Sequence, residues 1–260
     1  MANLFDLSKR VAVVTGGNGG IGLGFAEALA QHGCAVSIWG RNAEKNAAAA
    51  AKLKAHGGRV HTLVCDVASR AETDRATQET LAALGRIDGV FANAGIAGGG
   101  RTAFVDRTDE EWHHVLGVNL DGVFHTFQPI LRHMIERAGK GDAFGRLVAT
   151  SSMASLFGTA RNEHYAASKA AVNSLCQALA VEQARFGVTA NAVLPGWIDT
   201  EMTEGLQANE KFMANVLPRI PQRRFGRPAD FGGIAVYLMS EASAYHTADC
   251  FIIDGGYRAF

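Results

Sequence analysis

The sequence predicts an α/β fold, in which helices cover both faces of a parallel sheet. Short β-branched apolar runs alternate with longer helical patterns along the whole chain, which is typical of repeated strand–helix–strand units. The first of these runs passes through a glycine-rich turn directly into a helix. No linker interrupts the alternation, and 260 residues are enough for one sizeable core, so we expect a single domain over residues 1–260.

Seven segments have the length and composition of strands that are buried on both faces. They are residues 11–15, 35–39, 60–65, 87–92, 145–151, 188–194 and 250–253. Helices are expected between them, including the alanine run at 47–51 and long helices over 119–137 and 165–186. The least regular segment, about residues 200–227, contains Pro218, Pro221 and Gly226 and suits a lid over a substrate.

The turn after the first strand reads Thr-Gly-Gly-Asn-Gly-Gly-Ile-Gly over residues 15–22. Gly16 permits a tight turn, Gly20 lets the backbone approach a pyrophosphate, and Gly22 lets the helix pack closely against the strand. The helix N-terminus would then face the phosphates. We expect a dinucleotide site here that includes Gly16, Asn18, Gly19, Gly20, Ile21 and Gly22.

Tyr165 and Lys169 lie four residues apart in an alanine-rich stretch that predicts helix, so their side chains share one face. An ammonium close to a phenol favours the phenolate, and we expect it to draw the pKa of Tyr165 down toward neutrality. Tyr165 would then transfer protons at cellular pH. By itself the pair also suits an ordinary solvated helix face.

The spacing Thr-Gly-x-x-x-Gly-x-Gly together with Tyr-x-x-x-Lys resembles the short-chain dehydrogenase/reductase family, in its compact single-domain branch. The resemblance runs nearly end to end. Further matches, in order along the chain, are Asn93-Ala94-Gly95, Asn119, Ser152 at thirteen residues before Tyr165, and the segment from Pro195 to Thr200. The resemblance implies a Rossmann-type, doubly wound sheet of seven parallel strands.

Hydride transfer between a nicotinamide and a ketone or secondary alcohol is the reaction that the resemblance implies, with Asn119, Ser152, Tyr165 and Lys169 as catalytic residues. Tyr165 would exchange the proton of the substrate oxygen, and Ser152 would fix that oxygen. Lys169 would lower the pKa of Tyr165 and bind the nicotinamide ribose. Asn119 would hold a water behind Lys169, or else satisfy helix backbone.

The same resemblance implies cofactor contacts beyond the glycine turn. Their residues are Asp66, Val67, Asn93, Ala94, Gly95, Tyr165, Lys169, Pro195, Gly196, Ile198 and Thr200. Asp66 would contact the adenine, although an aspartate there also suits a helix N-cap. Ile198 and Thr200 would bind the carboxamide of the nicotinamide.

The end of the second strand bears on the choice between NADP and NAD. An acidic residue there would bind the ribose hydroxyls of NAD, but this position holds Gly40. Arg41 follows, and its guanidinium can stack on adenine and hold a 2′-phosphate. We therefore expect NADP. NAD remains the alternative, because a position that is often basic in NADP-preferring relatives is Gly19 and because Arg41 also suits a solvated helix start.

Composition argues against several kinds of partner. The formal net charge is zero, so no overall field attracts nucleic acid or an anionic membrane. Residues 1–9 lack an apolar signal core and no later run approaches about 18 apolar residues, so we expect a cytoplasmic protein. The histidines at 113, 114, 125 and 133 lack a ligand spacing, and we expect no metal. The cysteines at 34, 65, 176 and 250 are far apart and are expected to be reduced.

A few further residues are candidates for the site. His164 either touches substrate or is a polar residue at a helix start. The arginine cluster near the expected lid suits a solvated face or, as the alternative, an anionic substrate group; its members are Arg223, Arg224 and Arg227. Three apolar residues are expected to line the pocket, namely Phe157, Trp197 and Met202.

We predict an NAD(P)-dependent oxidoreductase, with a 3-oxoacyl thioester as the first candidate substrate and a polyol, sugar or steroid alcohol as alternatives. An epimerase or dehydratase that uses bound NAD is the alternative within the same class. The short C-terminal region argues against it, because such an enzyme would need a second domain to hold a nucleotide sugar. A noncatalytic redox sensor is the alternative from another class, but it would have no use for Ser152, Tyr165 and Lys169. The long helices over 119–137 and 165–186 are rich in small or apolar residues, which predicts that they pair across a two-fold axis. The resemblance to the family implies that the assembly is a homotetramer.

Overall fold

The computed structural model describes residues 3–98 and 102–260 and is built around a seven-stranded parallel sheet. Its strands are β1 (Val11–Thr15), β2 (Ala35–Gly40), β3 (Val60–Val64), β4 (Gly89–Ala92), β5 (Gly145–Thr150), β6 (Val188–Pro195) and β7 (Cys250–Ile253). They follow the order β3-β2-β1-β4-β5-β6-β7. Because the order reverses between β1 and β4, a binding crevice is expected at the carboxyl ends of these strands. The predicted fold class is confirmed.

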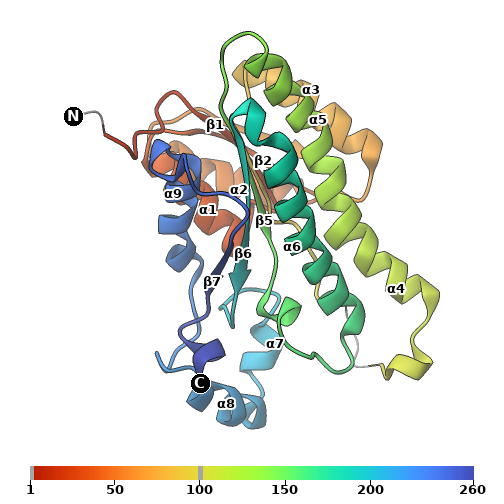
Figure 1. Ribbon diagram of the computed structural model, residues 1–260. Helices are drawn as coiled ribbons and strands as arrows, with labels where there is room; N and C mark the ends of the chain where they lie inside the picture. The colour runs from red at the N-terminus through yellow and green to blue at the C-terminus, as the bar shows by residue number, and fades with distance from the viewer. Residues whose placement is uncertain (1–2, 99–101) are drawn as a thin grey trace.

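Helices pack on both faces of this sheet. The α-helices of the described residues are α1 (Gly20–Gln31), α2 (Ala43–Lys54), α3 (Arg70–Leu84), α4 (Asp109–Leu116), α5 (Gly122–Ala138), α6 (Glu163–Gln183), α7 (Glu204–Gln207), α8 (Glu210–Val216) and α9 (Gly232–Met239). Figure 1 shows α1, α2 and α9 on one side of the sheet and α3, α5 and α6 on the other. Two separate apolar layers result, one around Phe25 and Phe231 and one around Trp39 and Phe127.

Most predicted strand ends lie within one residue of the observed ends, but the strand predicted over 87–92 begins two residues late, at Gly89. Side chains of α5 form hydrogen bonds with the backbone of Ile87. Its N–H donates to His133 Nε2 at 3.3 Å, and its carbonyl accepts from Arg137 Nη1 at 2.8 Å. The helix predicted from residue 119 also differs, because a π-helical turn (Gly117–Asp121) joins α4 to α5.

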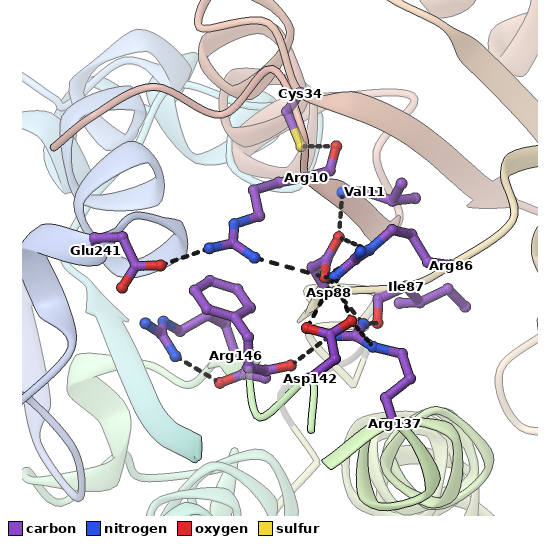
Figure 2. Close-up of polar contacts among 12 residues, drawn as sticks. Arg10, Val11, Cys34, Arg86, Ile87, Asp88, Arg137, Asp142, Arg146 and Glu241 are labelled. Atoms are coloured by element: carbon purple, nitrogen blue, oxygen red, sulfur yellow. Dashed lines mark hydrogen bonds and ion pairs between the residues drawn. The ribbon is translucent and has the colours of Figure 1, made fainter. Parts of the chain in front are cut away.

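A buried ion cluster closes the amino ends of the central strands (Figure 2). Asp88 is fully buried, and its carboxylate accepts from the Val11 N–H and from Arg86 Nε, each at 2.9 Å. Arg137 Nη1 lies 2.9 Å from the same carboxylate. A buried charge is tolerated only where it is paired and hydrogen-bonded, so this cluster fixes the starts of β1 and β4 against α5.

All four cysteines are free thiols, as expected. Burial raises the pKa of Cys65 and of Cys176 to about 12, so both thiols behave as small apolar groups. Within residues 3–98 and 102–260, no helix combines the length and apolar character needed to cross a bilayer. Over the same residues, no three or more His, Cys, Asp or Glu side chains gather as a metal site would require.

Candidate active site

A cleft of about 1250 Å³ opens at the carboxyl ends of the strands. Its walls come from the glycine turn before α1, the ends of β2 to β6, the segment 157–162 that precedes α6, and the segment that holds α7 and α8. Figure 1 places α7 and α8 beyond the carboxyl end of β6. The cleft therefore lies at the reversal of strand order, where ligands bind in folds of this kind.

Most of the predicted site residues line this one cleft. They are Gly16, Asn18, Gly19, Gly20, Ile21, Arg41, Asp66, Val67, Asn93, Ala94, Gly95, Ser152, Tyr165, Lys169, Pro195, Gly196, Ile198 and Thr200. The three predicted apolar lining residues, Phe157, Trp197 and Met202, are also present. Four groups are not in its wall: Gly22, Asn119, His164 and the arginines 223, 224 and 227.

The glycine turn leaves the N-terminus of α1 open toward the cleft. Gly16 and Gly20 have φ of +62° and +49°, in the left-handed region that favours glycine. Gly19 precedes α1 without a side-chain cap, and a Cβ there would meet no atom within 4 Å. Gly22 instead packs inward, because its Cβ would lie 2.3 Å from Gly16 O. Uncapped N–H groups beside open space suit a phosphate group.

Asn93 joins three strand ends at the floor of the cleft. Its N–H donates to Thr15 Oγ1 at 3.0 Å, and its side-chain nitrogen donates to Thr15 O at 3.2 Å. Its Oδ1 accepts from Thr150 Oγ1 at 3.1 Å. These bonds hold β1, β4 and β5 together beside the glycine turn.

The end of β2 has no room for an acidic side chain. A Cβ on Gly40 would lie 2.4 Å from Asn18 Nδ2 and 2.6 Å from Asn46 Oδ1. Asn46 is fixed in turn, since its side-chain nitrogen donates to Gly40 O at 2.8 Å and to Leu63 O at 3.0 Å. A carboxylate at position 40 would therefore displace a buried hydrogen-bonded amide.

Arg41 is exposed in the cleft and is not needed to start α2. Asn42 caps that helix instead, because its side chain accepts from the Lys45 N–H. Lys45 Nζ lies 2.7 Å from Glu201, in the segment before α7, so these two side chains bridge the cleft. Sequence patterns could not reveal this pair, since its members are 156 residues apart.

Asp66 forms a local turn and not a helix cap. Its Oδ1 accepts from the Ala68 N–H at 3.0 Å. Ser69 caps α3 by accepting from the Glu72 N–H, so the N-cap interpretation of Asp66 is wrong. Asp66 and Val67 instead lie in the cleft wall at the end of β3.

The helix α6 brings Tyr165 and Lys169 to the end of β5, beside Ser152. Lys169 is 4% exposed, and its Nζ donates to Thr150 O at 2.8 Å and lies 5.8 Å from the centre of the Tyr165 ring. Burial lowers the pKa of Lys169 to about 8.

Burial raises the pKa of Tyr165, and a hydrogen bond with Ser152 opposes that shift. The expected lowering of the pKa of Tyr165 is therefore wrong for the protein by itself. Desolvation of the phenol outweighs the hydrogen bond with Ser152, and the Lys169 ammonium donates to a backbone carbonyl, Thr150 O.

Asn119 lies fully buried in the π-helical turn, a local structure that is frequent at functional sites. Its Oδ1 accepts from the Ile96 N–H at 2.9 Å, and its Nδ2 donates to Ile96 O at 3.0 Å and to Ser168 Oγ at 3.2 Å. The side chain thus satisfies the loop after β4 and not a helix backbone. A Cβ on Gly95 would lie 3.1 Å from Asn119 Oδ1 and 3.3 Å from Lys169 Nζ. The side chains of Asn119 and Lys169 therefore both lie close to Gly95, where only glycine leaves room for them.

His164 lies in the first turn of α6 and packs against α4. Its ring stacks on Trp112, and Arg107 Nη1 lies 3.0 Å from its Nε2. Burial and the positive charge of Arg107 lower the pKa of His164, so Nε2 accepts from the guanidinium. Of its two interpretations, a polar residue at a helix start is the one that fits.

Known proteins resemble this chain along nearly its whole length. A family model described as Enoyl-(Acyl carrier protein) reductase matches residues 16–258. Sorbose reductase of Schizosaccharomyces pombe is 36% identical and covers 99% of both chains. The 3-oxoacyl-[acyl-carrier-protein] reductase of Chlamydia muridarum is 35% identical over 96% of this chain and 98% of its own. A solved gluconate 5-dehydrogenase of Burkholderia cenocepacia, in complex with NADP and tartrate, has a TM-score of 0.91 and 34% identity over 99% of this chain and 98% of its own.

Proposed function

Because this chain belongs to the short-chain dehydrogenase/reductase family, we propose that it is an NADP-dependent enzyme that interconverts a ketone and a secondary alcohol. One observation carries the proposal. Ser152, Tyr165 and Lys169 share a cleft with the uncapped N-terminus of α1, so a proton-transfer group and a phosphate site face the same space.

Each residue of the proposed catalytic set has its own task. Bound NADP would supply or accept the hydride. Tyr165 gives a proton to the substrate oxygen in reduction and removes it in oxidation, while Ser152 donates to the same oxygen and fixes it. Lys169, with a pKa of about 8, is charged at neutral pH and is available to the nicotinamide ribose. Asn119 would position the turn of α6 that carries Lys169, because its Nδ2 donates to the hydroxyl of the preceding residue, Ser168.

The preference for NADP is supported by the end of β2. Gly40 has no space for the carboxylate that would bind the ribose hydroxyls of NAD. Arg41 and Lys45 place two cations in the adjacent cleft wall, and a 2′-phosphate would suit them. NADP is also the coenzyme bound to the solved gluconate 5-dehydrogenase.

For the substrate we propose a sugar-derived ketone, as the names of the sorbose and gluconate enzymes suggest. The segment over residues 200–227 would act as a lid, with α7 and α8 covering the carboxyl end of the sheet. A 3-oxoacyl thioester is the second candidate, favoured by the chlamydial relative and by the apolar wall of Phe157, Trp197 and Met202.

We also propose a single-domain, cytoplasmic protein that assembles as a homotetramer. Free thiols are typical of a reducing compartment. Phe124 on α5 and Val181 on α6 are 45% and 82% exposed, which supports pairing of these two helices with a second copy. Light scattering tests the assembly, and a monomeric mass would refute it.

The test of the function begins with titration of NADPH and NADH, followed by protein fluorescence. NADPH should bind at least about tenfold more tightly, as expected for charge-assisted hydrogen bonds to its extra phosphate. A panel of ketones is then screened. Tyr165→Phe should keep coenzyme binding and lower kcat by about 100- to 10,000-fold. Binding without any turnover, unchanged by Tyr165→Phe, would favour the noncatalytic redox sensor.

A further inference from the structure

Arg161 has an unusual backbone conformation beside the proposed catalytic residues. It lies four residues before Tyr165, in the segment 157–162 that forms one wall of the cleft. Its φ is +62°, a region that side chains other than those of Gly, Asn and Asp rarely adopt. Glycine would make the same turn without strain, so the turn alone does not explain an arginine here. Such strained residues concentrate at ligand clamps.

Two side chains hold the Arg161 backbone in place. Arg107 Nη2 donates to Arg161 O and to Thr102 O, each at 3.1 Å, and Glu163 Oε1 accepts from the Arg161 N–H at 2.7 Å. The Arg107 side chain is itself only 3% exposed and is braced by His164. The wall segment is thereby tied to the loop after β4, and the position of Arg161 is fixed before any ligand arrives.

The charges of the cleft point to a role for Arg161 at its substrate end. The charged residues in the cleft wall are Arg41, Lys45, Asp66, Lys169, Glu201 and Arg161. Arg41 and Asp66 follow the ends of β2 and β3, and Lys45 lies in the first turn of α2, where it is paired with Glu201. All three are on the side expected to hold the adenosine. Lys169 is buried beside Tyr165. Among the residues that the structure describes, no carboxylate forms an ion pair with Arg161.

We propose that Arg161 binds a carboxylate of the substrate and makes a keto acid or hydroxy acid the preferred substrate over its neutral analogue. The inference rests on the proposed dehydrogenase function. A guanidinium matches a carboxylate through two parallel hydrogen bonds, and the adjacent Thr159 and Asn162 add polar groups to the same wall. The anion site therefore lies in the segment before α6, and not in the arginine cluster of residues 223, 224 and 227, which is outside the cleft wall.

Two ketones that differ in one group provide the test. L-Sorbose and 5-keto-D-gluconate share the ketone and the neighbouring stereocentres, but the second carries a carboxylate in place of the CH₂OH at the far end. At saturating NADPH, the wild-type kcat/KM should be about 10- to 100-fold higher for 5-keto-D-gluconate. Arg161→Asn, which tolerates the left-handed backbone, should remove this preference by raising KM with little change in kcat. Arg161→Lys should retain part of it.

Arg223→Asn is the matched control, because Arg223 is also an exposed arginine with positive φ, +54°, but does not line the cleft. This variant should keep the wild-type preference, and no variant should change the KM for NADPH. Tartrate gives a second readout with any ketone that is reduced, since its competitive inhibition constant should rise about tenfold in Arg161→Asn.

The two proposals fail separately. Turnover of neutral ketones with no preference for 5-keto-D-gluconate, or a preference that survives Arg161→Asn, would overturn the role of Arg161 and leave the dehydrogenase function intact. Coenzyme binding with no turnover of any ketone would overturn the dehydrogenase function, and the assignment of a substrate carboxylate with it.

Discussion

Replacement of Gly40 tests the physical basis of coenzyme choice. An aspartate at this point of the fold is the expected way to bind the ribose hydroxyls of NAD. We predict that Gly40→Asp destabilises the protein and does not create an NAD site. The added Cβ would lie 2.4 Å from Asn18 Nδ2 and 2.6 Å from Asn46 Oδ1. Asn18 Nδ2 donates a hydrogen bond to Asn46 Oδ1 at 2.7 Å, and Asn46 Nδ2 donates to two backbone carbonyls. Neither side chain can therefore move without losing hydrogen bonds.

The size of the effect follows from these contacts. Overpacking of a well-packed site costs about 1–3 kcal/mol. Each of the Asn46 hydrogen bonds that breaks adds about 0.5–1.5 kcal/mol. We therefore expect the free energy of unfolding to fall by about 2–5 kcal/mol, since one or two of these bonds must break. For a chain of this size the Tm should drop by roughly 5–20 °C.

Thermal unfolding monitored by circular dichroism measures the change in Tm, and titration of both coenzymes shows whether an NAD site has formed. Gly40→Ala should lose most of the same stability, because the clash begins at Cβ. Gly233→Ala is the control: its Cβ would meet no atom within 4 Å, and its position in α9 predicts a neutral or slightly stabilising change. A Gly40→Asp protein that unfolds at the wild-type temperature and binds NADH more tightly than the wild type would refute the steric reasoning.

Three further substitutions probe other parts of the structure. Lys169→Met should abolish most turnover yet raise the free energy of unfolding at pH 7 by up to about 3 kcal/mol. The pKa of Lys169 is about 8 in the folded protein and 10.5 in its usual state, so the buried charge opposes folding and its removal stabilises the protein. Denaturant unfolding should show this advantage shrinking as the pH rises from 8 to 10.5; an advantage independent of pH would contradict the cause. Asp88→Asn should lower the free energy of unfolding by about 3–5 kcal/mol, because Arg86 and Arg137 lose their buried counter-charge. Melting curves should show this loss of stability, while the Kd for NADPH stays the same. Gly22→Ala should raise the Kd for NADPH about tenfold or more, because its Cβ would push α1 away from the glycine turn, and an unchanged Kd in a fluorescence titration would count against that packing argument.

Patterns within a single element were predictive of the site. The glycine turn before α1 and the pair Tyr165 and Lys169 on α6 could be placed from spacing alone, because one turn or one helix face fixes how such residues lie relative to each other. Ser152 was placed by the resemblance, and the structure brings it to the same cleft. The start of β4 was misplaced because His133 and Arg137 bind the backbone of Ile87 from a helix that is distant in the sequence.

The sequence by itself determined the alternation of strands and helices, the seven-stranded parallel sheet and the glycine turn before α1, since these depend on hydrophobic periodicity and on turns between neighbouring elements. Only the tertiary structure decided the direction of the pKa shift of Tyr165, the lack of space beside Gly40, and the clamp of Arg107 on Arg161. Desolvation, steric exclusion and hydrogen bonding between segments depend on distances between residues that are far apart in the chain, and packing alone sets those distances.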